Sequence, residues 1–206
     1  IRGKEKGLYK KTFNVPAAWK GKVINIVFEG VMTDAEVKVN RKSAGAVHQG
    51  AFYAFKYDIT QLLKYGKSNL LEVTVSKHSA NASVNTAERK ADFWIFGGIF
   101  RPVWLEALPE VHIKEYSINA KATGEILGTF YTNKWADSRA IVSIRNNKGE
   151  LVDTITATDI GSNYGVYFFG KDLKNIQKWS AESPELYTAE FAIYSKGRLI
   201  HSVKQK

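Results

Sequence analysis

Apolar and polar residues alternate along most of this chain with a period of two. In the segment 35–40, Ala35, Val37 and Val39 share one face, while charged or polar side chains occupy the other. The same alternation recurs in 23–29 and 71–76. A period of two with one apolar face is typical of half-buried strands in antiparallel sheets. These segments are therefore predicted to be strands that cover a core with one side.

Shorter apolar runs bounded by turn residues predict further strands. In the first half of the chain these are 8–15, 52–57 and 100–108. In the second half they are 140–145, 151–156, 166–169, 187–194 and 199–203, and a further alternating segment starts at 111–113. Gly149 and Gly197 stand in polar turns between strands, where a hairpin needs positive φ. Both turns are therefore predicted to close β-hairpins.

Helical signals are sparse. Only 58–64 forms a convincing helical turn, with Asp58 or Thr60 as the cap and leucines on one side. The segment 77–98 is poor in strand signals, polar at first, and ends in an aromatic cluster, so it is predicted to be a long loop. Because no sustained period of 3.6 residues occurs, the predicted fold class is all-β, in β-sandwiches.

The length of 206 residues suits two domains of about 100 residues each. A boundary is predicted beside Pro109, giving domains 1–108 and 109–206.

The chain has no cysteine, which excludes disulfides, thiolate zinc sites and a cysteine nucleophile. No apolar run approaches the roughly 18 residues of a membrane span, so no membrane partner is expected. Residues 1–4 carry no apolar signal-peptide core, and the compartment stays open, with a bacterial periplasmic or secreted location favoured over a cytoplasmic one.

The net charge of +10 is concentrated in the first half. Residues 1–108 hold 17 Lys and Arg against 9 Asp and Glu, and residues 109–206 hold 13 against 11. A basic domain raises the question of nucleic-acid binding. The cations are nevertheless dispersed singly or in pairs such as Arg41-Lys42, never in a run of five or six. No nucleic-acid partner is therefore expected.

Ordered pieces of the sequence resemble the N-terminal region of glycoside hydrolase family 2. They are 7–22, 28–40, 48–60, 69–75 and, downstream, Trp179-Ser180-Ala181-Glu182-Ser183-Pro184-Glu185-Leu186-Tyr187. The sharpest piece is Asp92-Phe93-Trp94-Ile95-Phe96-Gly97-Gly98-Ile99-Phe100-Arg101-Pro102-Val103. Two positions depart from the family pattern: a longer turn follows Val39, and Ala51 replaces a second glycine. Family members usually have a further strand before the region of Gly7, which leaves the completeness of the first domain open.

The resemblance implies a jelly-roll sugar-binding domain at 1–108 and an immunoglobulin-like sandwich at 109–206, most similar to β-galactosidases. In the family these two domains precede a catalytic (β/α)₈ barrel. The implied partners are therefore the enzyme's own barrel, a carbohydrate and, as in many members, further copies of the chain. No cofactor is implied. Family members that act on β-glucuronides or β-mannosides keep those substrates open as alternatives.

Catalysis in this family needs residues that the chain does not show. Retaining glycosidases use two carboxyl groups about 5–5.5 Å apart. In family 2 both are barrel glutamates, and the acid/base residue follows an asparagine; this chain has no Asn-Glu dipeptide. No catalytic residue is therefore predicted here, and the chain alone is expected to be inactive. It would support the barrel and lend a loop to its sugar subsite. A stand-alone carbohydrate-binding module and a plain interaction sandwich are the alternatives.

Three residues are candidate sugar ligands in the full enzyme: Asp92, Phe93 and Trp94. The resemblance to β-galactosidases implies that Asp92 reaches the terminal sugar and a monovalent cation. A carboxylate accepts hydrogen bonds from neighbouring hydroxyls, and aromatic rings, including that of Phe96, can stack on sugar C–H faces. The structural alternative is that Asp92 caps a turn or pairs with Arg101 and that the rings are core. The four histidines show no metal-ligand spacing, so no other metal site is predicted.

Overall fold

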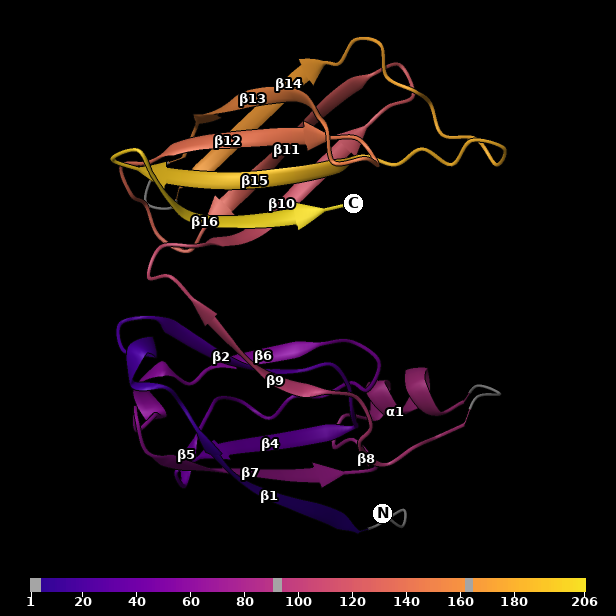
Figure 1. The fold of residues 1–206 in the computed structure, drawn as a ribbon. Coiled ribbons are helices and arrows are strands. Elements are labelled where there is room, and N and C mark those ends of the chain that lie inside the picture. The colour runs from indigo at the N-terminus through magenta and orange to yellow at the C-terminus, as the bar shows by residue number, and fades with distance from the viewer. Residues whose placement is uncertain (1–4, 91–93, 162–164) are drawn as a thin grey trace. The chain divides into compact units, whose positions relative to one another are not determined.

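The computed structural model describes residues 5–90, 94–161 and 165–206, and the chain forms two compact units, Ile1–Ala107 and Leu108–Lys206. Both units are built of β-sheet (Figure 1), which confirms the predicted all-β class. Helix in the described ranges is limited to α1 (Ala82–Arg89) and the 3-10 turns η1 (Ala17–Trp19) and η2 (Thr60–Leu62). Across those same ranges, no helix is long and apolar enough to cross a bilayer.

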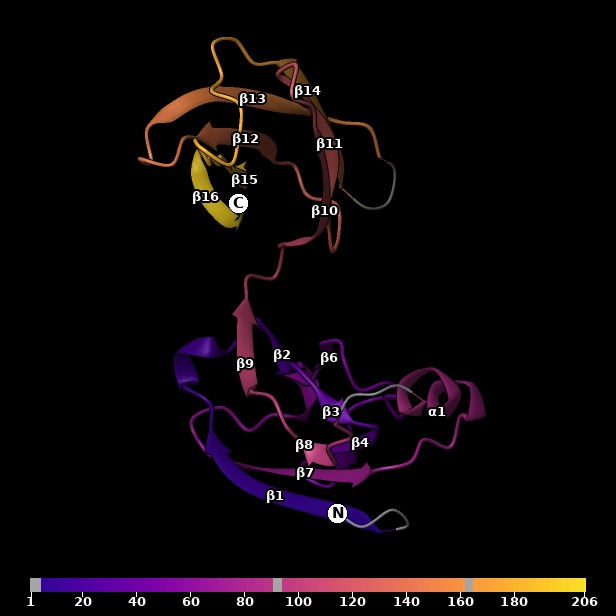
Figure 2. The same ribbon diagram turned by 90° about the vertical axis from the view of Figure 1, so that its right-hand side faces the viewer.

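Two sheets enclose the core of the first unit. One has the strand order β1 (Lys6–Asn14), β7 (Ser68–Ser76), β4 (Asp34–Val39) and β5 (Lys42–Ser43). The other has the order β6 (Phe55–Asp58), β2 (Val23–Phe28) and β9 (Val103–Leu108). A short pair joins β3 (Val31–Met32) to β8 (Gly98–Ile99). Figure 2 shows the two sheets as separate layers of this jelly-roll sandwich.

The predicted alternation sets the inward faces of these sheets. Val37 and Val39 of β4 pack with Ile24 and Phe28 of β2, and all four side chains are at most 1% exposed. An apolar cavity of about 350 Å³ opens between β1 and β9, which are both sheet edges. The core of the first unit is therefore reached from solvent along that side.

The second unit is one seven-stranded sheet that curls around its own core. Its strand order is β10 (Ile113–Ala120), β11 (Glu125–Thr132), β14 (Val166–Asp172), β13 (Leu151–Asp159), β12 (Arg139–Arg145), β15 (Thr188–Ser195) and β16 (Arg198–Gln205). Within the described residues, the register between β13 and β14 comprises two residue pairs, Thr158 with Phe168 and Asp159 with Tyr167. The two halves of the sheet fold over each other beyond that narrow junction (Figure 2), which produces the immunoglobulin-like sandwich.

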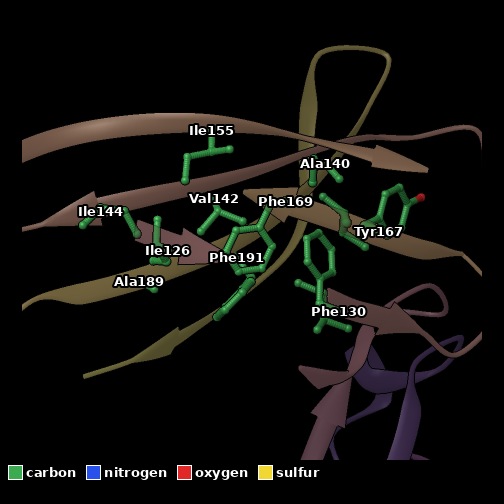
Figure 3. Packing of buried hydrophobic residues seen from close by; sticks show 13 residues of the cluster. Ile126, Phe130, Ala140, Val142, Ile144, Ile155, Tyr167, Phe169, Ala189 and Phe191 are labelled. Atoms are coloured by element: carbon green, nitrogen blue, oxygen red, sulfur yellow. The ribbon is translucent and has the colours of Figure 1, made fainter. Parts of the chain in front are cut away.

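Aromatic side chains fill the core of the second unit (Figure 3). The ring of Phe191 on β15 lies 5.5 Å from that of Phe130 and 5.7 Å from that of Phe169, both in edge-on orientation. Phe130 also stacks on Tyr167, with ring centroids 5.0 Å apart. These four side chains are at most 1% exposed, so strands from both halves of the sheet meet on one aromatic cluster.

The predicted hairpin turns at Gly149 and Gly197 are confirmed. Gly149 has φ of 82° and Gly197 has φ of 76°, the left-handed conformations that the two hairpins require. The longer turn expected after Val39 is wrong: Val39 pairs with Lys42, and Asn40 (φ 51°) and Arg41 (φ 69°) make a two-residue turn by adopting the left-handed conformation without glycine. The helical turn expected at 58–64 is η2, and the Asp58 carboxylate accepts a hydrogen bond from the Thr60 amide at 2.9 Å.

The predicted long loop is wrong over its middle part, where α1 forms. Its eight residues carry no apolar stripe and include weak helix formers such as serine, threonine and asparagine, so periodicity does not reveal it. The helix is held by its surroundings instead: the Asn81 side chain caps the first turn by accepting from the Ser83 amide at 3.0 Å.

Strand β11 (Glu125–Thr132) is a second element that the sequence pattern does not predict. Gly128 interrupts its apolar pattern, and glycine ordinarily weakens a strand. The structure shows why glycine stands there: a Cβ at position 128 would lie 2.1 Å from the Ser117 carbonyl oxygen and 2.7 Å from the Phe169 ring. Gly128 therefore obscures the strand in the apolar pattern, and its lack of a side chain lets β10 and the Phe169 ring pack closely against β11.

Candidate functional site

The aromatic segment after residue 93 lies largely at the surface of the first unit. Trp94 is 76% exposed and Phe96 is 49% exposed. Phe96 stacks on Phe100 with ring centroids 5.7 Å apart and planes 13° from parallel. The Arg101 guanidinium carbon lies 5.3 Å from the centroid of the Phe100 ring. Trp94 thus leads into a ring–ring–guanidinium stack, which we call the aromatic patch (Trp94, Phe96, Phe100 and Arg101).

Backbone pairing and Arg101 attach the aromatic patch to the body of the unit. Gly98 and Ile99 form β8, which pairs with β3. The Arg101 Nη1 donates to the Phe52 carbonyl at 3.2 Å, which ties the patch to the loop 45–54 before β6. Phe52 is itself 39% exposed, so an aromatic ring from that loop adds to the exposed apolar surface there. The patch is therefore held by contacts from two separate parts of the chain.

Two carboxylates fasten α1 to the body of the unit, Glu88 at the loop 45–54 and Asp34 at β4. Both oxygens of Glu88 lie 3.0 Å from the Ala51 amide nitrogen, which donates to them. The Asp34 Oδ2 accepts from the Ala80 amide at 2.7 Å, just before α1. The Arg89 Nη1 donates to the Lys77 carbonyl at 2.7 Å. Charge-assisted bonds of this kind are stronger than neutral ones, so the segment 77–90 is anchored at both ends.

His48 lies in the loop 45–54 and contacts other residues of the loop and the start of β6. Its ring stacks on Phe55 with centroids 3.6 Å apart and meets Tyr53 edge-on at 5.1 Å. The Nε2 atom lies 2.9 Å from the Gly50 carbonyl oxygen. Burial lowers the pKa of His48 below its ordinary value, which favours the neutral imidazole. Its contacts make His48 a packing residue of this loop.

The predicted ligands have different outcomes. Asp92 and Phe93 lie outside the described residues, whereas Trp94 lies in the exposed aromatic patch. Across residues 5–90, 94–161 and 165–206, no group of three or more His, Asp or Glu side chains could hold a metal ion. Sequence reasoning missed Phe52 and Glu88 as parts of this region. The strand predicted at 52–57 starts too early: β6 begins at Phe55, so Phe52 and Tyr53 lie in the loop, and Gly50 just before them was the available signal.

The role of Glu88 can be tested by its neutral isostere. Glu88→Gln replaces a charged acceptor by a neutral one, a difference of about 1 kcal/mol. We expect hydrogen exchange at the Ala51 amide and in α1 to become about fivefold faster, because that free energy corresponds to a fivefold change in local opening. Exchange followed by mass spectrometry on the 206-residue chain measures it. Glu182→Gln, at an exposed position of the second unit, is the matched control, and equal acceleration in both variants would contradict the anchoring role.

Comparison with known proteins places the two units in one family. Residues 2–109 match the sugar binding domain of glycosyl hydrolases family 2, and residues 110–206 match a second profile of glycosyl hydrolases family 2. The chain belongs to glycosyl hydrolase family 2. Within this family it is similar to a putative beta-glucuronidase of Formosa agariphila, with 31% identity over 202 residues, and to a beta-galactosidase of Thermoanaerobacter pseudethanolicus, with 30% identity over 199 residues.

The family 2 chain is shorter than these relatives. The alignments cover 96% and 93% of this chain but only 24% and 26% of the respective relatives, so the chain spans about a quarter of their length and corresponds to N-terminal domains of the family. The Bacteroides uniformis beta-glucuronidase structure superposes with a TM-score of 0.80 at 24% identity, covering 98% of this chain and 26% of that one. That likeness shows the fold.

Proposed function

We propose that this chain is the non-catalytic N-terminal part of a retaining glycosidase, most similar to a β-galactosidase. Its domains 1–108 and 109–206 would support a catalytic barrel, and the segment 77–101 would contribute to the barrel's sugar subsite. The observation that carries the proposal is the exposed aromatic patch, because it lies in a family 2 sugar-binding domain and is anchored by Arg101. Exposed rings on a held segment suit contact with a sugar or a second domain.

The sugar ligands of the proposal are Asp92, Phe93 and Trp94. A carboxylate at Asp92 would accept hydrogen bonds from hydroxyls of the terminal sugar. The Trp94 ring is 76% exposed and so is available to stack on a sugar face. A monovalent cation beside Asp92 remains part of the expectation from the family resemblance, and no step of the proposal depends on it.

Two substrate classes are candidates for the longer enzyme. The resemblance around Asp92 favours a β-galactoside, and one of the relatives above is named a beta-galactosidase. A β-glucuronide is the second candidate, because the Formosa relative is named a putative beta-glucuronidase and matches over 96% of this chain. A homo-oligomeric enzyme is part of the proposal, as in many family members.

Assays on chromogenic glycosides test the proposal. The 206-residue chain should give no turnover of β-galactoside, β-glucuronide or β-mannoside, because it contains no Asn-Glu dipeptide, in which the acid/base glutamate of the family lies. The longer protein that includes a barrel should hydrolyse one of the three, which assigns the substrate. Turnover by the 206-residue chain above that of a heat-unfolded sample would contradict the proposal.

The stand-alone module makes a different prediction for the same chain. A module would bind the terminal glycoside on its own, through the aromatic patch. A change of tryptophan fluorescence on addition of the glycoside would report such binding. That change should disappear in Trp94→Phe. Our proposal expects no binding of the simple glycosides at this patch without the barrel, because the subsite is shared between the domains.

A further inference from the structure

A polar pocket lies at one end of the four-stranded sheet of the first unit, away from the aromatic patch. Its volume is about 420 Å³, within the ~300–1,000 Å³ typical of ligand sites. The turn between β4 and β5 forms one wall, and the loop between η2 and β7 forms the other. The residues used below are Thr12, Asn40, Arg41, Lys64, Ser68 and Asn69, and all of them line the pocket. None of them belongs to the segment 77–101.

Two asparagines hold the walls of this pocket together. Asn69 is 1% exposed, and its Oδ1 accepts from the Asn40 Nδ2 and from the Lys64 amide, each at 2.8 Å. The Asn40 Oδ1 in turn accepts from the Leu70 amide at 3.0 Å. These bonds fix the backbone of Arg41 and Lys64 relative to each other while leaving both charged groups at the surface. The site is therefore built before any ligand arrives.

Cationic residues that are distant from one another in the sequence lie together at this pocket. Arg41 and Lys64 line it, and Lys42, the first residue of β5, and Lys67 are the next cations along the chain after them. In the described part of the chain, none of these four side chains has a salt bridge. Acidic residues of this unit are engaged elsewhere: Glu72 pairs with Lys10, Glu36 with Lys38 and Glu106 with Lys56, at 3.1, 2.7 and 3.1 Å. Uncompensated positive charge around a concave site attracts anions.

We propose that this pocket binds an anionic saccharide through its carboxylate or sulfate group. The Arg41 guanidinium can hold such a group with two parallel hydrogen bonds, and the Lys64 ammonium adds a second charge. The hydroxyls of Thr12 and Ser68 can both donate to and accept from sugar hydroxyls. The matching family profile is that of a sugar binding domain. Among the described residues, no aromatic ring lines the pocket, so recognition here would rest on charge and hydroxyl groups rather than on stacking of a sugar or a nucleobase.

Titration of the ¹⁵N-labelled 206-residue chain tests the assignment. The probes are a hyaluronan tetrasaccharide, which carries carboxylates, a κ-carrageenan tetrasaccharide, which carries sulfates, and neutral chitotetraose. We expect at least one anionic probe to shift the amides of Arg41, Lys64 and Ser68, and chitotetraose to leave them unchanged. The tighter of the two anionic probes identifies the anionic group. Added salt should weaken the binding, because charge pairing at an exposed site is screened.

Paired charge-removing variants separate this pocket from the general charge of the protein. Arg41→Gln combined with Lys64→Gln should weaken binding of the anionic probe at least tenfold. Lys148→Gln combined with Lys174→Gln removes the same charge from exposed positions of the second unit and should change it less than twofold. Where the double variant loses its fold by circular dichroism, the two single variants replace it, each expected to weaken binding about threefold.

Several results would overturn the proposal. These are absence of binding by both anionic probes, equal binding of chitotetraose, equal weakening in the two variant pairs, and inorganic sulfate binding as tightly as the κ-carrageenan tetrasaccharide. Tighter binding of an eight-nucleotide oligothymidylate would replace the saccharide by a nucleic acid. None of these measurements uses glycoside turnover or the segment 77–101, so their failure leaves the proposed function standing.

Discussion

Phe191→Ala is expected to lower the free energy of unfolding of the second unit by about 3–5 kcal/mol. The Phe191 ring is fully buried and contacts Phe130, Phe169 and Tyr116, whose ring centroid lies 4.9 Å away. Its removal leaves a cavity where β15 meets β10, β11 and β14 of the other half of the curled sheet; Figure 3 shows the Phe130, Phe169 and Phe191 rings there. Neighbouring rings cannot close that space without breaking their own packing, so the full cost of the cavity is expected.

Calorimetry on the 206-residue chain measures this effect. In a unit of about 100 residues, each kcal/mol shifts Tm by roughly 4–8 °C, so the transition of the second unit should fall by more than about 10 °C. Phe168→Ala is the matched control, because Phe168 is 43% exposed on the opposite face of β14. It should cost less than about 1 kcal/mol. A loss of similar size in both variants would show that the aromatic cluster does not organise the core.

In the longer enzyme that the proposed function calls for, Asp92→Asn should reduce kcat/KM by about 10- to 150-fold. The substitution keeps size and hydrogen-bonding atoms but removes the charge, and a hydrogen bond to a charged group contributes roughly 1.5–3 kcal/mol. The effect follows from the proposed contact between Asp92 and the terminal sugar. Stability should hardly change, because in this role the partner of the Asp92 carboxylate is the sugar and not the folded chain. Kinetics and thermal unfolding of the same variant are the measurements.

A structural role for Asp92 predicts the opposite effects on kcat/KM and on stability. If Asp92 caps a turn or pairs with Arg101, Asp92→Asn should lower stability by about 1 kcal/mol and leave kcat/KM unchanged. Asp137→Asn, at an exposed position of the second unit, controls for the loss of one negative charge. Unchanged kcat/KM together with a lower Tm would remove Asp92 from the set of sugar ligands.

The sequence by itself determined the fold class and most strands. Alternation in segments such as 35–40 has one physical solution, a strand with one buried face, and the resulting β4 buries Val37 and Val39. The hairpins at Gly149 and Gly197 were equally determined, since few residues other than glycine accept positive φ without cost. Family membership was also visible in the sequence, because ordered motifs survive where overall identity is low.

Only the tertiary structure decided the features that depend on contacts distant along the chain. Helix α1 has only eight residues, too few to be stable alone, and is held by Glu88 and Asp34, whose partners lie 37 and 46 residues away. Gly128 fits a strand because of its close approach to Ser117 and Phe169. Arg41 and Lys64 form one pocket because Asn40 and Asn69 join their loops. Local patterns record which side of a strand is apolar, but they carry no information about which distant groups meet. Those pairings arise from packing, hydrogen bonding and loop closure across the whole unit.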